Sequence, residues 1–168
     1  MQQLVLVFIV AVLLRLPTVG SKSMWLDEAF GAYHAQRAEL ATPTVVEGTH
    51  PPLYYTFLHY WIPVAGNGEV GLRLPSVAVS LAGIGLLYLL ARMLFDRHVA
   101  LVAATLLAVS PLDVWYAQEA RMYIFVTFFG LLFALALLWS RPLSVLIIAA
   151  AAGVGLYFDI LCFHYGPV

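Results

Sequence analysis

Long apolar stretches alternate with short polar segments along most of this chain. The longest apolar stretches are residues 74–94, 99–116, 122–139 and 143–161, and a shorter one covers residues 4–14. A helix needs about 17 to 25 apolar residues to cross a hydrocarbon core about 30 Å thick. Each stretch is apolar on all sides, and a helix closes its own backbone hydrogen bonds in lipid. The pattern therefore predicts about five transmembrane helices.

The first of these helices is expected to end near Gly20, with Arg15 snorkelling toward the interface and Pro17 near its end. A cleaved signal peptide is not expected, because the stretch lacks a basic n-region and no Ala-x-Ala-like site follows before Arg15. A long polar loop, residues 21–73, then holds most of the ionised groups.

Within this loop, residues 52–64 are hydrophobic and rich in Tyr and Trp, but they are too few for a span. Aromatic side chains favour the membrane–water interface, so this segment predicts a helix that lies along the membrane surface. A re-entrant or spanning segment is the alternative. With five spans, the 21–73 loop and the loop around Glu119 lie on the same side; if residues 52–64 cross, they lie on opposite sides.

Composition agrees with a lipid environment. The 168 residues are 63% hydrophobic and 10% charged, and their mean hydropathy is +0.94, whereas soluble domains carry about 25% charged residues. The net charge of −1 argues against nucleic-acid binding. Cys162 is the single cysteine, which excludes an intrachain disulfide, and the five histidines form no close ligand pair, so no metal site or cofactor is indicated. The expected fold is an all-α polytopic membrane protein that forms one module over residues 1–168.

Charge indicates the orientation only weakly. Arg92 and Arg97 lie in a short loop, and positive residues near span ends favour the cytoplasmic side. This arrangement places the 21–73 loop and Glu119 on the extracytoplasmic side of a multi-pass plasma-membrane protein.

Three acidic residues are candidates for chemistry. Asp27 and Glu28 form a tandem pair that can position a nucleophile, accept a proton or bind a cation. The alternative is the start of an interfacial helix, where acids are favoured by the helix dipole. Glu119 lies between two apolar spans, where an ionisable group is costly and hence a functional candidate. Its alternative is a loop ion pair with Arg121, although residues i and i+2 do not face each other on a helix. Asp113, just before Trp115, is a further candidate, and an interfacial cap is its expected role.

Two further segments border the polar loop. Residues 50–55, with His50 before two prolines and Tyr54 after them, could form a rigid wall beside a lipid headgroup, or simply start a helix. Arg73 opens the second span and could pair with a phosphate or snorkel. The glycines at 66, 68 and 71 match a dinucleotide-binding fingerprint by letters, but no βαβ unit surrounds them, so they predict a turn.

These motifs, in this order, resemble the polytopic membrane glycosyltransferases of the C-type fold, close to relatives of protein O-mannosyltransferases and of the aminoarabinose transferase that modifies lipid A. The matching segments are residues 25–29 (WLDEA), 50–55 (HPPLYY), 73–75 (RLP), 110–111 (SP) and 115–123 (WYAQEARMY). Each is short, but together they cover nearly the whole chain in family order.

The resemblance implies a polyprenyl-phosphate sugar donor and transfer to an acceptor hydroxyl of a glycan, lipid or protein, at the extracytoplasmic membrane face and without cofactor or metal. It implies that Asp27, with Glu28, helps to activate the acceptor and that Glu119 is the acid of the second external loop. It assigns a phosphate contact to Arg73. His50, Tyr54, Arg121 and Tyr123 would bind substrate.

Relatives in this family are commonly several times longer, with more spans. The chain is therefore expected to be the N-terminal module of a longer protein, a truncated product, or a module completed by a partner chain. A non-catalytic module that binds a lipid-linked sugar or assists a partner transferase is the alternative to an enzyme. A transporter is disfavoured, because the predicted spans lack charged residues in their central turns.

Overall fold

The computed structural model describes residues 2–36 and 52–138, together with the single residues 147, 150 and 153. All regular structure in these described residues is helical, which confirms the all-α expectation. The helices are α1 (Gln2–Arg15), α2 (Leu26–Ala35), α3 (Pro52–Ala65), α4 (Glu69–Leu94), α5 (Arg97–Ala108), α6 (Pro111–Ala117) and α7 (Tyr123–Leu138).

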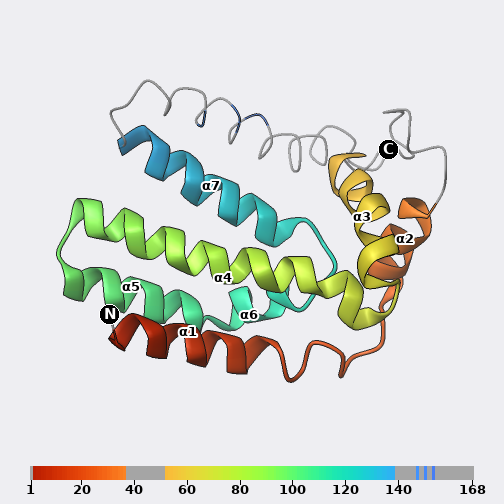
Figure 1. The fold of residues 1–168 in the computed structure, drawn as a ribbon, viewed down its shortest axis with the longest axis horizontal. Coiled ribbons are helices and arrows are strands. Elements are labelled where there is room, and N and C mark those ends of the chain that lie inside the picture. The colour runs from red at the N-terminus through yellow and green to blue at the C-terminus, as the bar shows by residue number, and fades with distance from the viewer. Residues whose placement is uncertain (1, 37–51, 139–146, 148–149, 151–152, 154–168) are drawn as a thin grey trace, which may run out of the picture.

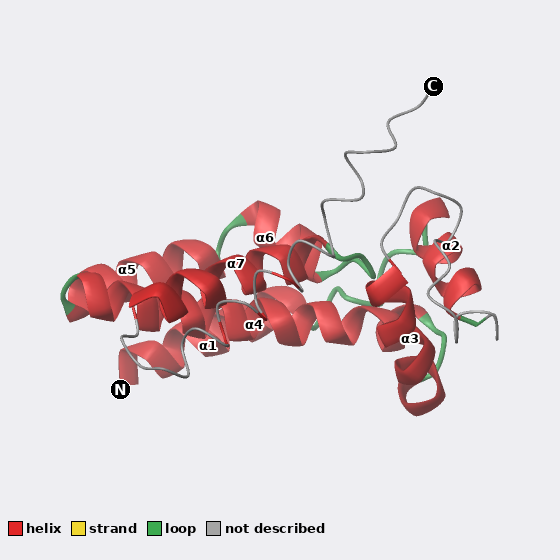
Figure 2. Ribbon diagram, turned by 90° about the horizontal axis from the view of Figure 1, so that it is seen from above, coloured by secondary structure: helices red, strands yellow, loops and turns green. Residues whose placement is uncertain are grey.

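Helix α4 is the centre of the arrangement. It contacts α1, α5, α6 and α7, and four helices (α1, α4, α5 and α7) run lengthwise beside one another (Figure 1). Helices α2 and α3 pack against each other at one end of this bundle, and α3 also contacts α4. The view from above places α2 and α3 at the same end (Figure 2). The described residues of the polar loop therefore include two helices, α2 and α3, that form a cap over one end of the bundle.

Among the described residues, one helix is long and apolar enough to cross a membrane by itself. This is α4, whose 26 residues extend about 39 Å at 1.5 Å per residue. The pair α5 and α6 qualifies only if its two helices, bent by 57°, count as one broken span. Helices α1 and α7 are apolar but shorter, with 14 and 16 residues. Five spans thus remain a prediction, and the fifth, residues 143–161, falls almost entirely outside the described residues.

Three predicted boundaries were wrong. Helix α1 ends at Arg15 rather than near Gly20, and α4 begins at Glu69, so Arg73 lies inside that helix instead of opening it. Residues 99–116 are not one helix. Ser110 caps the N-terminus of α6 by accepting a hydrogen bond from Asp113 N, and Pro111 occupies the first turn. A capping serine followed by proline starts a new helix, which explains the break.

The aromatic segment forms α3, as predicted, and its packing explains its position. Tyr55 and Leu58 are buried in the core that α3 shares with α2 and α7. The helix is followed by Gly66, whose φ of 81° suits glycine after a helix end. Gly68 then caps α4, so the predicted turn holds for these two glycines, whereas Gly71 lies within α4. The location of α3 on a membrane surface remains a prediction.

Gly71, in the first turn of α4, is the glycine of this segment where a side chain is least tolerable. A Cβ there would lie 2.4 Å from the carbonyl oxygen of Ala65 and 2.8 Å from that of Gly66. Backbone atoms cannot yield as a flexible side chain can. We expect Gly71→Ala to destabilise the chain by about 1–3 kcal/mol, the usual cost of overpacking. Gly130→Ala is the matched control, because nothing lies within 4 Å of its Cβ and alanine favours a helix. Denaturant unfolding of both variants in detergent measures the effect. A free energy of unfolding for Gly71→Ala equal to that of Gly130→Ala would contradict the prediction.

Candidate functional site

The start of α2 meets the loop between α6 and α7 at the capped end of the bundle. The guanidinium of Arg121 lies 3.1 Å from the carboxylate of Asp27. The backbone N–H of Ala120 donates to the carboxylate of Glu28 at 2.8 Å. These contacts join segments that lie 92 residues apart in the chain. The two acidic segments singled out in the sequence therefore lie against each other at one end of the bundle.

Glu28 and Arg73 form a buried ion pair below this contact. Arg73 donates to both carboxylate oxygens of Glu28, from Nε at 2.9 Å and from Nη2 at 2.6 Å. It also donates to the carbonyl oxygens of Val19, Lys22 and Ser23 at 2.8, 2.9 and 3.4 Å. An arginine has five N–H donors, and these five contacts engage all of them. In this arrangement Arg73 holds the loop between α1 and α2 against Glu28.

The surroundings of Glu28 favour its charged form. Burial alone would raise the pKa of this carboxyl, but the hydrogen bonds from Arg73 and from Ala120 N–H outweigh burial and hold the pKa below its usual range. Its two oxygens thus accept from three N–H groups. Glu28 is ionised and both of its oxygens accept hydrogen bonds, which is expected of a residue that stabilises the fold rather than of a free base.

A pocket of about 330 Å³ opens beside this ion pair. Its lining residues are Lys22, Ser23, Trp25, Glu28, Arg73, Trp115, Gln118 and Glu119. The indole N–H of Trp115 donates to the carboxylate of Glu119, and the ammonium of Lys22 lies 4.7 Å from the centre of the Trp115 ring. We call this cavity the Glu119 pocket. It combines a carboxylate, an ammonium and an aromatic face, the groups that bind phosphorylated and hydroxylated ligands.

Glu119 is half-buried, and its environment favours the neutral form. Burial raises the pKa of this carboxyl and the nearby charge of Glu28 adds to the increase, while Trp115, Arg121 and Lys22 oppose it. Its carboxylate accepts a hydrogen bond from Trp115, and Arg121 pairs with Asp27 instead. The loop ion pair between Glu119 and Arg121, the alternative left open by the sequence, is therefore not the arrangement found.

Asp27 and Arg121 form a second cluster at the edge of this site. The Asp27 side chain is 43% exposed, whereas Arg121 is buried with its guanidinium 5.6 Å from the centre of the Tyr123 ring. Arg121 also approaches the Asp27 carbonyl and the Tyr123 hydroxyl, both at 3.5 Å. Its Nε has no acceptor among the described residues. The lining of the Glu119 pocket includes Glu28 but not Asp27.

The remaining predicted substrate contacts lie elsewhere or are not described. Tyr54 is buried in the core, with its ring 5.7 Å from that of Phe125. His50 lies outside the described residues. No cluster of three or more His, Cys, Asp or Glu side chains that could hold a metal ion occurs in the described part of the chain.

Sequence reasoning missed a buried polar junction between α1, α4 and α6. Arg15 has no exposed surface, and its guanidinium lies 2.7 Å from the carboxylate of Asp113. Arg15 also donates to the Ser80 hydroxyl at 2.8 Å. The expectations that Arg15 snorkels and that Asp113 is an interfacial cap were both wrong. The sequence did contain one signal for this pair. Arg15 directly follows an apolar stretch and Asp113 lies among apolar residues, so each needs a partner of opposite charge if it is buried.

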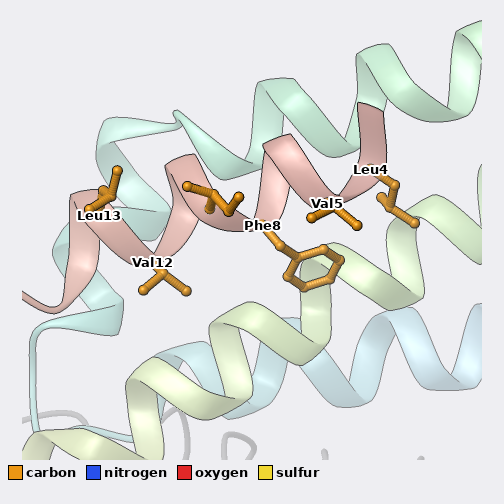
Figure 3. A pocket seen from close by; sticks show the side chains of 6 residues that line it. Leu4, Val5, Phe8, Val12 and Leu13 are labelled. Atoms are coloured by element: carbon orange, nitrogen blue, oxygen red, sulfur yellow. The ribbon is translucent and has the colours of Figure 1, made fainter. Parts of the chain in front are cut away.

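A cavity of about 540 Å³ follows α1 and is lined by Leu4, Val5, Phe8, Ile9, Val12 and Leu13. Figure 3 shows these apolar side chains along the helix. No ionisable group lines this cavity, so it offers no acid–base chemistry, and the Glu119 pocket with the Asp27–Arg121 cluster is the candidate active site.

Compared with known families, residues 49–165 match the family described as dolichyl-phosphate-mannose-protein mannosyltransferase. No curated protein and no solved structure matches the chain significantly. The matched range includes Arg73, Glu119 and Arg121, while Asp27 and Glu28 precede it. It covers more than half of the sequence. The chain therefore belongs to the dolichyl-phosphate-mannose-protein mannosyltransferase family, a family of membrane-bound glycosyltransferases.

Proposed function

We propose that this chain takes part in transferring a glycosyl group from a polyprenyl-phosphate sugar to an acceptor hydroxyl at the extracytoplasmic face of a membrane. The observation that carries the proposal is the junction of Asp27 with Arg121 beside the Glu119 pocket. A base, a cation and a pocket with a second carboxylate thus come together from the start of α2 and from the loop between α6 and α7. Family membership supports the reaction class.

Asp27 is the proposed proton acceptor. Its exposed carboxylate is open to an incoming hydroxyl, whereas both oxygens of the neighbouring Glu28 are occupied. The acceptor oxygen attacks the anomeric carbon as its proton passes to Asp27. The bond between that carbon and the phosphate oxygen breaks, and the phosphate keeps the electron pair. Attack from the face opposite the phosphate inverts the anomeric configuration.

The departing phosphate needs a cation, and the contacts favour Arg121 and Lys22 over Arg73. Arg121 has an Nε–H without an acceptor among the described residues, and its polar contacts other than the 3.1 Å ion pair with Asp27 are long, at 3.5 Å. Lys22 reaches the Glu119 pocket from the loop before α2. Arg73 would have to release Glu28 or a carbonyl oxygen to bind phosphate. In our proposal Arg73 therefore acts indirectly, by holding Lys22 and Glu28 in place.

Glu119 is the proposed second carboxylate of the reaction site. Its position beside the exposed Trp115 ring suits a sugar or acceptor whose apolar face stacks on the indole while a hydroxyl donates to the carboxylate. Holding donor and acceptor in this orientation supplies much of the rate enhancement in a group transfer.

The proposal is tested by supplying membranes that contain the chain with a radiolabelled polyprenyl-phosphate sugar. We expect label to move to an acceptor, with the anomeric configuration opposite to that of the donor. Retained configuration would overturn the direct displacement. Binding of the labelled lipid without any transfer, in the presence of acceptor glycans, lipids and peptides, would favour a non-catalytic module.

Glu119 leads to a pH-dependent prediction. Because its folded pKa lies above the ordinary value, the ionised carboxylate disfavours the folded state at neutral pH, and this cost is relieved as the pH falls through the folded pKa. We expect Glu119→Gln to unfold at a higher temperature than the unmodified chain at pH 7.5, and this advantage to shrink on acidification toward pH 4.5. Glycosyl transfer should also decline on acidification, and the decline should begin at a pH above 4.5, the ordinary pKa of a glutamate side chain. The test is to measure the thermal midpoint of unfolding and kcat/KM of both proteins between pH 4.5 and 7.5. The prediction is wrong if neither quantity differs between Glu119→Gln and the unmodified chain.

A further inference from the structure

A buried junction of three side chains joins α1, α4 and α6. Its members are Arg15, Ser80 and Asp113, and we call it the Arg15 junction. The Asp113 carboxylate accepts from Arg15 at 2.7 Å and from the Ser80 hydroxyl at 2.5 Å. Arg15 also donates to the carbonyl oxygens of Ala11 and Ala108, at 3.0 and 2.9 Å. Two of the three side chains belong to helices next to the Glu119 pocket, yet none of the three lines it.

Stability alone does not explain this junction. Removing an ion pair from water costs about as much as the pair returns, and apolar side chains of similar volume often serve a core as well or better. Apolar packing is not directional, however, whereas the hydrogen bonds of this junction fix the relative orientation of the helices that they join. Arg15 reaches the end of α5, at Ala108, and the first turn of α6, at Asp113, and so spans the break between these two helices. It therefore fixes the angle at which α6 leaves α5.

The far end of α6 is attached to the same helix. The amide of Gln118 donates toward the carbonyl oxygens of Leu14 and Arg15, at 3.1 Å each, and toward the hydroxyl of Thr18 at 2.6 Å. The last carbonyls of a helix have no partner within it, so Gln118 satisfies groups that α1 leaves open. Helix α6 is thus held at its beginning and at its end by the C-terminal turn of α1.

Helix α6 needs such support because it has only seven residues. A helix of that length is not stable by itself. It nevertheless carries Trp115, whose indole N–H donates to Glu119, and Glu119 itself comes just after the C-cap residue Gln118. Any rotation of α6 would move both groups relative to Glu28 and Lys22 across the pocket.

We propose that Arg15, Asp113 and Ser80, together with Gln118, whose side chain also lines the pocket, are positioning residues that hold α6 so that Trp115 and Glu119 stay aligned there. Only the expected effect of these residues on glycosyl transfer rests on the proposed function. The alignment itself can be measured without turnover, because Trp115 reports on the carboxylate to which it is bonded. The charged groups that act on Glu119 are Glu28 from α2, Lys22 from the preceding loop, Arg73 from α4 and Arg121 from its own loop.

The test uses the full chain in lipid nanodiscs with Trp25, Trp61 and Trp139 replaced by phenylalanine, so that Trp115 is the single fluorophore. In this protein Trp115 emission should titrate with a midpoint above 4.5, the ordinary Glu value, and the titration should vanish in Glu119→Gln. The double variant Arg15→Met/Asp113→Leu removes the junction without leaving one buried charge unpaired. We expect its midpoint to shift toward 4.5 and Trp115 to become more accessible to acrylamide.

Gln118→Ala provides a second variant in case the double variant fails to fold, because it releases the other end of α6 without touching the buried charges. It should shift the Trp115 titration in the same direction. Where transfer is measurable, both variants should lose on the order of 10²-fold in kcat with little change in KM, as expected from a misplaced group. Folded variants with an unchanged Trp115 titration and unchanged quenching would overturn the proposal. An unmodified chain without transfer but with the expected titration shifts would refute the proposed function and leave this inference intact.

Discussion

Replacing Asp27 with asparagine is expected to remove most of the glycosyl transfer while the chain stays folded. Asparagine has the same shape and keeps an oxygen that can accept from Arg121, but it cannot take up the acceptor proton. A positioned base contributes about 10²–10⁴-fold to such a reaction, and we expect a loss of that size in kcat. The KM for the lipid donor should change little, because Arg121 and Lys22 remain in place.

The matched control for this variant is Glu69→Gln, which removes the same charge from an acid in the first turn of α4, outside the Glu119 pocket. Both variants should be compared by initial rates with labelled polyprenyl-phosphate sugar in membranes. Circular dichroism and donor binding would show that each protein is intact. If Asp27→Asn transferred sugar as fast as the control and Glu119→Gln did not, the base would be Glu119 and our assignment would be wrong.

The helical nature of the chain could be predicted from its sequence because it is a local property. Long runs of apolar residues favour helices over strands, and α4, α7 and the aromatic α3 lie close to their predicted places. The break between α5 and α6 was also encoded locally, in Ser110 and Pro111. Uniform hydrophobicity across residues 99–116 concealed it, because a capping serine and a proline change average hydropathy very little.

The pairings in the site could not be predicted in the same way. Arg73 and Glu28 lie 45 residues apart, and Arg15 and Asp113 lie 98 apart. No periodicity links such residues, and each charge by itself has an adequate explanation at a membrane interface. The tandem Asp27 and Glu28 illustrate this limit. They look equivalent in the sequence, but successive residues of a helix point about 100° apart, so one faces Arg73 and the other faces Arg121.

The ion pair of Glu28 with Arg73 leads to the second large effect. Removing one partner of a buried pair leaves an uncompensated charge and typically costs about 3–5 kcal/mol. We expect Arg73→Met to reach this range, because the substitution also leaves the carbonyl oxygens of Val19, Lys22 and Ser23 without their donor. Glu28→Gln should cost less, since glutamine can still accept from Arg73 and from Ala120 N–H. Unfolding by titrated SDS, followed by circular dichroism, measures both values.

Lowering the pH distinguishes the contribution of this ion pair to stability from a contribution of packing. Because the folded pKa of Glu28 lies below its ordinary value of 4.5, the pair contributes stability that is fully present above that value and is lost as the pH falls through the folded pKa. The unmodified chain should therefore lose stability in this acid range, and Glu28→Gln should lose less of it. A Glu28→Leu/Arg73→Met double variant, in which no buried charge remains unpaired, should be more stable than Arg73→Met alone. If the double variant were instead as unstable as the sum of the two single variants, the two side chains would act independently. The loop that carries Lys22 would then have to be held in place by something other than this pair.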